Sequence, residues 1–313
     1  MIFPTMDVLD DILDTLDLKG VLYFRTDFSE PWSVTVPEYS RAARFHLVVQ
    51  GTCHVGFDSG AKAALGPGDL VLIPWGRSHV LADSEATRPA DLETVISQSG
   101  YRGDGVLALG KGDPEAATQM ICGHLSFRDG ADHPLLRALP EYMVITAAIR
   151  ARQPWLDEML RLIARKMFAE EIGSPAAVTR LSEVVFIELL RAGVGQCEDL
   201  KHVIDAFQDG QIGRALQLIH EKPSDGWTVD SLAGAVGMSR SRFAERFRDL
   251  IGSGPMAYLA DWRLQKALAL LDRSHFSVQQ IAHRAGYKSP AAFSRAFAGK
   301  FGVPPSAYRR QTA

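Results

Sequence analysis

Two stretches toward the end of the chain share one pattern: TVDSLAGAVGMSRSRFAERFRDLIGSGPMAYL at Thr228–Leu259 and SVQQIAHRAGYKSPAAFSRAFAGKFGVPPSAYR at Ser277–Arg309. The first third of each copy aligns at an offset of 49 residues, and everything beyond Phe243 and Phe293 aligns at an offset of 50. The matched pairs include Phe247 with Phe297, Gly252 with Gly302, Pro255 with Pro305 and Tyr258 with Tyr308. The chain therefore repeats one structural unit, and the second copy has one more residue at its turn.

Each copy opens with a short helix that ends in a turn. Thr228 and Ser277 are good N-cap residues, because their hydroxyls can accept hydrogen bonds from the free N–H groups of a first helical turn. Gly237 and Gly286 follow, where a sharp turn between helices favours a residue that tolerates positive φ.

A second helix follows the turn in each copy, beginning at Ser239 or Ser289. Its apolar residues recur at i, i+4 and i+8, so that one stripe is buried and the opposite face is free. These stripes are Phe243, Phe247 and Ile251 in the first copy, and Phe293, Phe297 and Phe301 in the second. The pattern predicts two helix-turn-helix units, at 228–252 and 277–302, whose second helices fit the DNA major groove.

The free faces of the two recognition helices are the predicted DNA-binding surface. Arginine pairs with guanine, glutamate accepts from cytosine and alanine contacts the thymine methyl group, whereas Lys288 and Lys300 suit phosphate contacts. The alternative is that both faces are merely solvated. The predicted DNA-binding residues are Arg240, Ser241, Arg242, Ala244, Glu245, Arg248, Lys288, Ser289, Ala291, Ala292, Arg295 and Lys300.

Met256–Arg273 joins the two units without any Pro or Gly. Its apolar residues predict one rigid helix that holds the units at a fixed separation. The recognition helices would then enter successive major grooves, about 34 Å apart.

Charge is divided unevenly along the chain. Residues 211–313 hold 15 Lys/Arg and 7 Asp/Glu, a net charge of +8, and residues 1–210 hold 19 and 30, a net charge of −11. A basic domain attached to an acidic one is typical of a nucleic-acid binder with a separate sensing half. Variation of surface charge between ordinary domains is the alternative.

The rest of the composition indicates an ordinary globular protein of the cytoplasm. No apolar run approaches the ~20 residues of a membrane span, and the acidic N-terminus lacks a signal-peptide core. The three cysteines, Cys53, Cys122 and Cys197, are odd in number and widely spaced, which argues against a disulfide framework. Near the N-terminus, apolar residues between Val8 and Leu16 predict a short amphipathic helix.

The repeated unit resembles the DNA-binding domain of the AraC/XylS family of transcription regulators. The second copy, IAHRAGYKSPAAFSRAFAGKFGVPPSAYRR, is close to the signature of that family, and the resemblance covers roughly 210–310. It implies promoter DNA and RNA polymerase as partners. The base-contacting positions of the family fall on Ser241, Ala244 and Glu245 in the first copy, and on Ala291, Ala292 and Arg295 in the second.

From Ser33 to Leu81 the pattern changes to short alternating runs divided by Gly and Pro, which predicts β-strands closing into a small barrel or sandwich. Gly68-Asp-Leu-Val-Leu-Ile-Pro74-Trp-Gly76-Arg-Ser-His79 resembles the second motif of cupin barrels. The first motif is only partly present, because its usual His-x-His and Glu ligands are missing. An oxygen-activating metal site needs such ligands, so the resemblance implies a cupin-type sensor without a cofactor rather than an enzyme. A metal-dependent cupin enzyme with accessory nucleic-acid binding is the alternative.

Five residues are candidates for an effector pocket: Trp32, His46, His79, Cys122 and His124. Three interpretations remain open for them. The first is an apolar small-molecule pocket with a few polar anchors. The second is a barrel in which these residues are simply packed. The third is a thiol or metal sensor built from His46, Cys122, His124 or His133.

The sequence pattern of residues 141–209 predicts helices. Leu156, Leu160 and Ile163 form one apolar stripe, and Val185 and Leu189 belong to a second. The two predicted helices either cover the barrel or pair with those of another subunit, since regulators of the family that this chain resembles are commonly dimers.

We therefore predict an α+β multidomain protein. An N-terminal cupin-like β-barrel (1–140) is followed by a helical connector with possible dimerisation helices and a linker (141–209), and by a C-terminal all-α domain (210–313) with two helix-turn-helix units joined by a long helix. The expected function is sequence-specific DNA binding by a transcription regulator, modulated by an unknown small-molecule effector.

Overall fold

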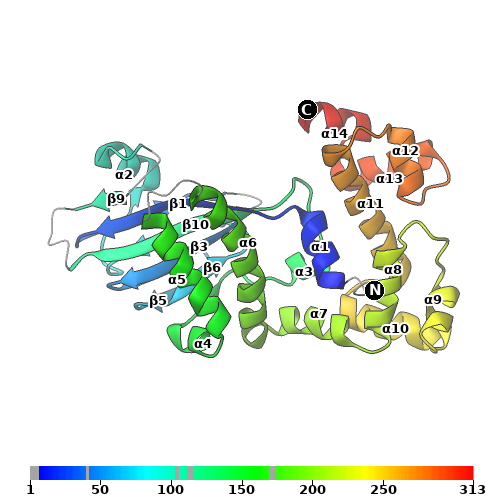
Figure 1. Cartoon of the computed structure of the whole chain (residues 1–313), viewed down its shortest axis with the longest axis horizontal. Helices are drawn as coiled ribbons and strands as arrows, with labels where there is room; N and C mark the ends of the chain where they lie inside the picture. Colours follow the sequence, from blue (N-terminus) through cyan, green and yellow to red (C-terminus); the bar gives the residue numbers. More distant parts are fainter. Residues whose placement is uncertain (1–6, 40–41, 103–105, 111–115, 169–173, 313) are drawn as a thin grey trace. The chain divides into compact units, whose positions relative to one another are not determined.

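The computed structural model describes residues 7–39, 42–102, 106–110, 116–168 and 174–312 (Figure 1). Contacts divide the chain into two compact units. Unit 1 takes in the described residues of Met1–Asp17, Arg128–Ala138 and Glu198–Ala313, and unit 2 takes in those of Leu18–Phe127 and Leu139–Cys197. Two segments from the first half of the sequence thus pack with the C-terminal helices. The boundaries at 140 and 209 remain predictions, because contacts alone do not test them.

Unit 2 contains two mixed β-sheets. The six-stranded sheet has the order β11-β6-β3-β10-β1-β9, with bounds β1 Lys19–Phe28, β3 Ala42–Gln50, β6 Leu70–Ile73, β9 Val106–Leu109, β10 Thr118–Ser126 and β11 Met143–Ile145. The five-stranded sheet has the order β5-β4-β7-β2-β8, with bounds β2 Ser33–Val36, β4 Cys53–Phe57, β5 Lys62–Leu65, β7 His79–Ala82 and β8 Ala90–Asp91. The β-rich, cupin-like prediction is confirmed, although the strands form two sheets rather than one closed barrel.

The two sheets share one hydrophobic core because alternate side chains of each strand point inward. Val34 on β2 and Val55 on β4 meet Val48 on β3 and Met120 on β10 in that core. Gly76 makes the turn between β6 and β7 possible. Its φ is +58°, and a Cβ there would lie 2.2 Å from the Tyr39 carbonyl oxygen, so the glycine of the motif is required by a close approach of two backbone segments.

Helices cover the six-stranded sheet on the side away from this core. α6 (Ser174–Gly193) packs against β1 and β11, and α5 (Pro154–Phe168) packs against α6 (Figure 1). Phe186 of α6 lies edge-on to Phe127 with ring centroids 5.7 Å apart. The apolar stripes of the two helices therefore bury against the sheet and against each other. Smaller helices complete the unit: α2 Leu92–Ser99, α4 Ala147–Ala151 and the 3-10 turn η2 Val194–Gln196.

Unit 1 is helical. Its elements are α1 Val8–Leu16, α3 Pro134–Arg137, α7 Glu198–Gln208, α8 Ile212–Glu221, α9 Val229–Ala235, α10 Arg240–Ile251, α11 Pro255–Arg273, α12 Val278–Arg284, α13 Pro290–Phe301 and α14 Pro305–Thr312. Thr228 and Ser277 cap α9 and α12 through capping boxes, and Gly237 and Gly286 have φ values of +67° and +78°. Both helix-turn-helix units and the long helix between them are present as predicted.

A chain of buried polar side chains joins four elements of unit 1. Asp11 of α1 accepts from His220 Nδ1 of α8 (2.9 Å), and His220 Nε2 lies 2.7 Å from the hydroxyl of Tyr258 on α11. That hydroxyl lies 3.0 Å from Nε2 of His133, whose Nδ1 accepts from the backbone N–H of Leu135. Neutral His133 therefore donates to Tyr258, and Tyr258 donates to His220. Burial lowers the pKa of both histidines, so that the neutral forms are favoured.

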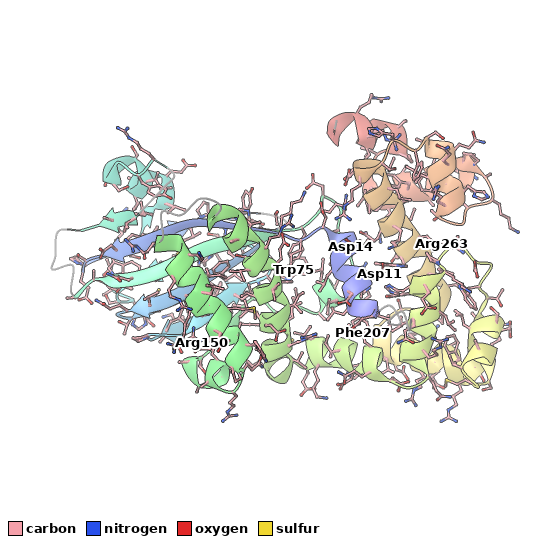
Figure 2. The ribbon with its side chains drawn as sticks, in the orientation of Figure 1. Asp11, Asp14, Trp75, Arg150, Phe207 and Arg263 are labelled. Carbon is pink, nitrogen blue, oxygen red and sulfur yellow. The ribbon has the colours of Figure 1, made fainter. Side chains whose placement is uncertain are left out.

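Asp11 is the charged end of this chain (Figure 2). Burial by itself would raise the pKa of Asp11, but hydrogen bonds from His220 and Lys266 and the charge of Lys266 outweigh it and lower the pKa. Lys266 Nζ of α11 lies 2.6 Å from the carboxylate. α1 is thus fixed to α11 by the ion pair with Lys266 and to α8 by the hydrogen bond from His220, both made to a carboxylate that is shielded from water.

The segment Arg128–Ala138, called here the 128–138 segment, contacts α11 and the second helix-turn-helix unit. Arg128 pairs with Asp17 and Asp272, and the amide of Gln265 donates to the Gly130 carbonyl (3.0 Å). Lys300 Nζ of α13 lies 3.1 Å from Asp132. These contacts hold part of the first half of the sequence against the helix that separates the two DNA-binding units.

Replacing Tyr258 with Phe should lower the free energy of unfolding by about 1–3 kcal/mol, because a buried donor of His133 and a buried acceptor of His220 lose their partner. Tyr308→Phe is the matched control at the equivalent position of the repeat. Its hydroxyl lies farther from these two partners, 3.4 Å from the Asp129 carbonyl and 3.5 Å from Asp272, so the loss of stability should be smaller. Urea unfolding measures the free energy of unfolding of both variants. Equal losses would contradict the importance of the hydrogen-bonded chain through Tyr258.

Candidate nucleic-acid interface and sensor cavity

The two recognition helices, α10 and α13, each bury one apolar stripe and leave the opposite face open. Phe243 and Phe247 of α10, and Phe293 and Phe297 of α13, are fully buried. The predicted DNA-binding residues that are exposed are Arg240, Ser241, Arg242, Glu245, Arg248, Lys288, Ser289, Ala291 and Arg295, and Ala244, Ala292 and Lys300 are half-buried. The second helix of a helix-turn-helix unit is the one that enters the major groove, and contacts of these side chains with bases stay a prediction.

Three cations of this region are engaged in ion pairs. Arg240 pairs with Asp230 at 2.8 Å, but both side chains are well exposed, so the pair is weak and open to exchange with phosphate. Arg246 pairs with Asp209, and the sequence pattern did not single it out. Lys300 differs from Arg240, because its Nζ lies between Asp132 (3.1 Å) and Asp261 (2.8 Å) with a side chain only 14% exposed. A phosphate contact by Lys300 would require these pairs to break.

Unit 2 encloses a cavity of about 260 Å³ between its two sheets, near α2. Its walls are mostly apolar or aromatic, and a few polar groups from β1, β3 and β10 face it. The lining residues are Thr26, Phe28, Val34, Val36, Tyr39, Arg44, His46, Leu81, Leu92, Ile96, Cys122 and Gly123.

Behind this wall, His46, His79 and Cys122 form a buried hydrogen-bonded cluster. His79 Nδ1 lies 2.8 Å from the Arg77 carbonyl and must donate to it, so neutral His79 accepts at Nε2 from His46 (2.9 Å). His46 Nδ1 is then left to accept from the Cys122 thiol, 3.1 Å away. The tautomers of both histidines, and the direction of the hydrogen bond from the thiol, follow from the single carbonyl of Arg77.

The electrostatics of the cluster favour neutral groups. Burial lowers the pKa of His79 to about 4, with Arg44 contributing, and it lowers the pKa of His46 well below 6.5. Burial also raises the pKa of the Cys122 thiol far above its usual value. A thiol that stays protonated is a poor nucleophile, and this disfavours the thiol-sensor hypothesis.

The residues predicted for the pocket separate in the structure. His46 and Cys122 line the cavity, His79 supports His46, and His124 lies edge-on to Tyr39 with centroids 5.1 Å apart. Trp32 packs in the core against Phe28. His133 belongs to unit 1, where it bonds to Tyr258. Within the described part of the chain, no three His, Cys, Asp or Glu side chains are grouped so as to hold a metal ion.

Arg44 and Tyr39 also line the cavity and were not predicted. Arg44 lies on β3 two residues before His46, so strand alternation places both side chains on the same face. This two-residue spacing is the signal in the sequence that places Arg44 beside His46. An arginine in a strand usually faces solvent, whereas Arg44 is only 7% exposed.

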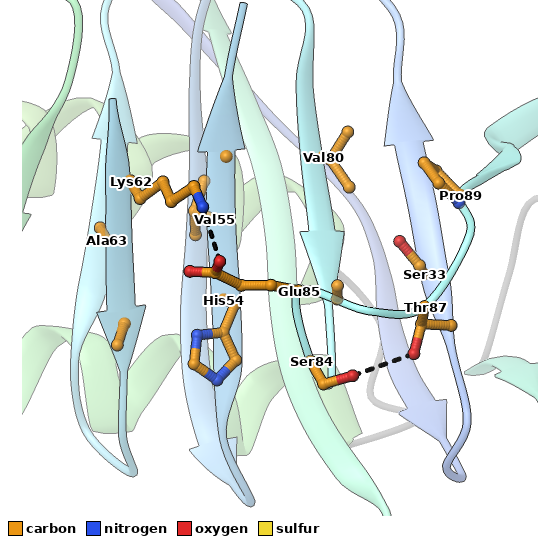
Figure 3. A pocket seen from close by; sticks show the side chains of 13 residues that line it. Ser33, His54, Val55, Lys62, Ala63, Val80, Ser84, Glu85, Thr87 and Pro89 are labelled. Carbon is orange, nitrogen blue, oxygen red and sulfur yellow. Dashed lines mark hydrogen bonds and ion pairs between the residues drawn. The ribbon is translucent and has the colours of Figure 1, made fainter. Parts of the chain in front are cut away.

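A second hollow, of about 380 Å³, lies on the outer face of the five-stranded sheet (Figure 3). Small side chains there, such as Gly56, Ala64 and Ala82, leave the space open. Its charged groups, Lys62 and Glu85, already pair with each other at 2.6 Å and are about 60% exposed. None of the predicted pocket residues lines it, and we therefore take the inner cavity as the candidate ligand site.

Comparison with known proteins gives matches along almost the whole chain. A family model described as a cupin matches residues 7–195, and one described as a helix-turn-helix domain matches residues 232–311. The HTH-type transcriptional regulator AlkR of Acinetobacter baylyi is 31% identical over 309 residues, which cover 98% of this chain and 100% of that protein. The HTH-type transcriptional regulator MtrA of Neisseria gonorrhoeae is 29% identical over 98% of this chain and 99% of that protein.

Among solved structures, the DNA-binding domain of AdpA in complex with a target DNA is 35% identical. The match covers 33% of this chain and 92% of that domain, with a TM-score of 0.32. The resemblance carried by the sequence motifs is confirmed by the family models and the relatives. Separately, no described helix is long and apolar enough to cross a membrane.

Arg295→Ala should relax sequence preference by about 1–3 kcal/mol at one base pair, because an exposed arginine on a recognition helix suits bidentate contact with guanine. The measurement is competition binding between a sequence selected from a random DNA pool and its single-base variants. Lys288→Ala is the control, and it should weaken binding to all sequences alike. A uniform loss for Arg295→Ala would make it a phosphate contact, and a pool with no enriched sequence would favour a general DNA-compacting protein.

Acid should destabilise the protein below about pH 6.5. Burial lowers the pKa of His46, His79, His124, His133 and His220 in the folded state, so the unfolded chain binds more protons as the pH falls from 6.5. Each histidine then removes up to about 1.4 kcal/mol per pH unit. Urea unfolding between pH 7 and 5 measures the slope.

His124→Gln tests the assignment of this slope. The pKa of His124 is lowered to about 4 by burial and by Arg44, so the variant should show a shallower dependence of stability on pH. A slope that is unchanged in the variant, or stability that is flat between pH 7 and 5, would contradict the account.

Proposed function

The chain belongs to the AraC-like family of HTH-type transcription regulators with an N-terminal cupin domain, and from this membership we propose that a small molecule in the unit 2 cavity changes how the chain binds promoter DNA. DNA would be bound by α10 and α13. The relatives are named as transcription regulators, and the cupin region is accordingly assigned to sensing rather than to catalysis.

The observation that carries the sensing proposal is the inner cavity. It combines apolar walls with a small number of polar groups that converge from neighbouring strands, and this is the usual form of a ligand site. Its volume of about 260 Å³ suits a small molecule. The His46–His79–Cys122 cluster holds one wall of the cavity in a fixed set of hydrogen bonds, so that part of the site is already organised before a ligand arrives.

The route from the cavity to the DNA-binding unit would be the chain itself. β1 and β10 pair along their length, and both supply cavity residues. β1 directly follows α1, and β10 directly precedes the 128–138 segment. Both of those segments pack in unit 1. A shift of the two strands would therefore act on α11 through Asp11 and Arg128, provided that the segments have two stable positions.

Three further features of the proposal come from family membership. A second subunit would complete a dimer, RNA polymerase would be the partner at the promoter, and the protein would act in the cytoplasm where bacterial DNA lies. The exposed Trp155 of α5 and Val184 of α6, 75% and 44% exposed, offer apolar contacts for such a dimer.

Blocking the cavity should abolish any response to an effector. Ile96 lines the cavity from α2 and is only partly buried, so Ile96→Trp fills the space at moderate cost to packing. Thr94→Trp, exposed on the same helix, is the matched control. A set of compounds with about ten heavy atoms, each small enough for a cavity of this size, is screened by thermal shift. DNA affinity is then measured with each compound that binds.

The wild type and Thr94→Trp should bind such compounds and change their DNA affinity, and Ile96→Trp should do neither. Two results would overturn the proposal: compounds that act equally on Ile96→Trp, and compounds that bind in the cavity without any effect on DNA affinity.

A further inference from the structure

The cavity contains a buried positive charge. Arg44 of β3 is 7% exposed, lines the cavity, and lies with its guanidinium 5.5 Å from the ring centroid of Tyr39. Removing a charge from water is costly unless an opposite charge or strong hydrogen bonds replace the water. A guanidinium has five N–H donors, so Arg44 can keep its present contacts and still bind an anion.

The positive charge of Arg44 acts on the neighbouring side chains of the cavity. It helps to lower the pKa of His46, of His79 and of His124, so that these imidazoles stay neutral near pH 7. The thiol of Cys122 stays neutral as well. Among the described residues that line the cavity, Arg44 is the one with a charged side chain and none is Asp or Glu.

The other side chains that line the cavity are mostly apolar, and they would contact the rest of the ligand. Phe28, Val36 and Leu81 face the cavity from the strands, and Leu92 and Ile96 face it from α2. The cavity volume of about 260 Å³ lies just below the ~300–1,000 Å³ that is usual for small-molecule pockets. A ligand of roughly ten heavy atoms with an apolar body would fill it.

We propose that this cavity recognises a small monocarboxylate, whose carboxylate pairs with Arg44 and whose apolar body lies against the walls formed by β1, β2 and α2. The inference rests on the proposed function, since it names the class of effector that the same cavity takes. A carboxylate matches the planar fork of a guanidinium with two parallel hydrogen bonds. A neutral apolar molecule would displace water from Arg44 without replacing its hydrogen bonds, and an amine would be repelled.

Ligand chemistry provides the first test on the full-length protein. Calorimetric titrations compare hexanoate, octanoate and decanoate with octan-1-ol and octylamine. We expect the carboxylate of best fit to bind at least about tenfold more tightly than octan-1-ol, as a charge-assisted bidentate pair implies, and octylamine to show no binding. Octan-1-ol that binds as tightly as the carboxylates would overturn the inference.

Variants of Arg44 provide the second test. Arg44→Met should reduce the preference for the carboxylate over octan-1-ol to within about twofold. Arg44→Lys keeps the positive charge but lacks the paired donors of a guanidinium, so it should retain part of the preference. Unchanged affinity for the selected DNA sequence shows that each variant is folded. If Arg44→Met does not fold, the ligand comparison in the wild type still decides the question.

The results also separate this inference from the proposed function. If octan-1-ol and octanoate bind equally well to the wild type and to Arg44→Met, but not to Ile96→Trp, the cavity is a ligand site and only its selectivity for anions is wrong. If no carboxylate binds to the wild type, the inference is overturned, and the thermal-shift screen with Ile96→Trp then decides separately whether the cavity takes other ligands.

Discussion

The ion pair between Asp11 and Lys266 is the interaction on which the organisation of unit 1 depends. A carboxylate that is 7% exposed can stay charged there only because Lys266 and His220 both bond to it. The pair attaches α1, which begins at residue 8, to α11, which joins the two helix-turn-helix units. Through His220 and Tyr258 the same network reaches His133. One buried polar chain thus fixes two distant segments of sequence to the helix that sets the spacing of the DNA-binding units.

The segments held by this network are also the ones that lead along the chain from unit 1 into unit 2. Unit 1 holds both α1 and the 128–138 segment, and these are the segments on either side of the paired strands β1 and β10. The two segments also touch each other, because Arg128 donates to the carbonyl groups of Thr15 and Leu16. Movement of one segment would therefore carry the other with it.

The sequence predicted the parts of the structure that depend on local chemistry. The N-caps Thr228 and Ser277, the buried phenylalanines of α10 and α13, and the glycine turns follow rules that act within a few residues. β1 and β10 were not predicted as strands, because β10 is buried on both faces over most of its length and shows no alternation. The Asp11–His220 contact joins residues 209 positions apart, and no local pattern could indicate it. In the cavity, His46 and Cys122 were identified from their chemistry, whereas Arg44 was missed because burial, and not residue type, gives it a role.

The two copies of the repeat are tied into unit 1 in different ways. In the first, Arg246 of α10 pairs with Asp209 beside α8, and this pair lies within the C-terminal part of the chain. In the second, Lys300 of α13 pairs with Asp132, and Phe301 lies against Gly130. Both contacts are made to the 128–138 segment, which continues directly from β10. Displacement of that segment would break ion pairs and packing of the second copy, and it would also break the bond between His133 and Tyr258 at the end of the first copy. The 128–138 segment therefore contacts both copies, through ion pairs and packing with the second and through a hydrogen bond with the first.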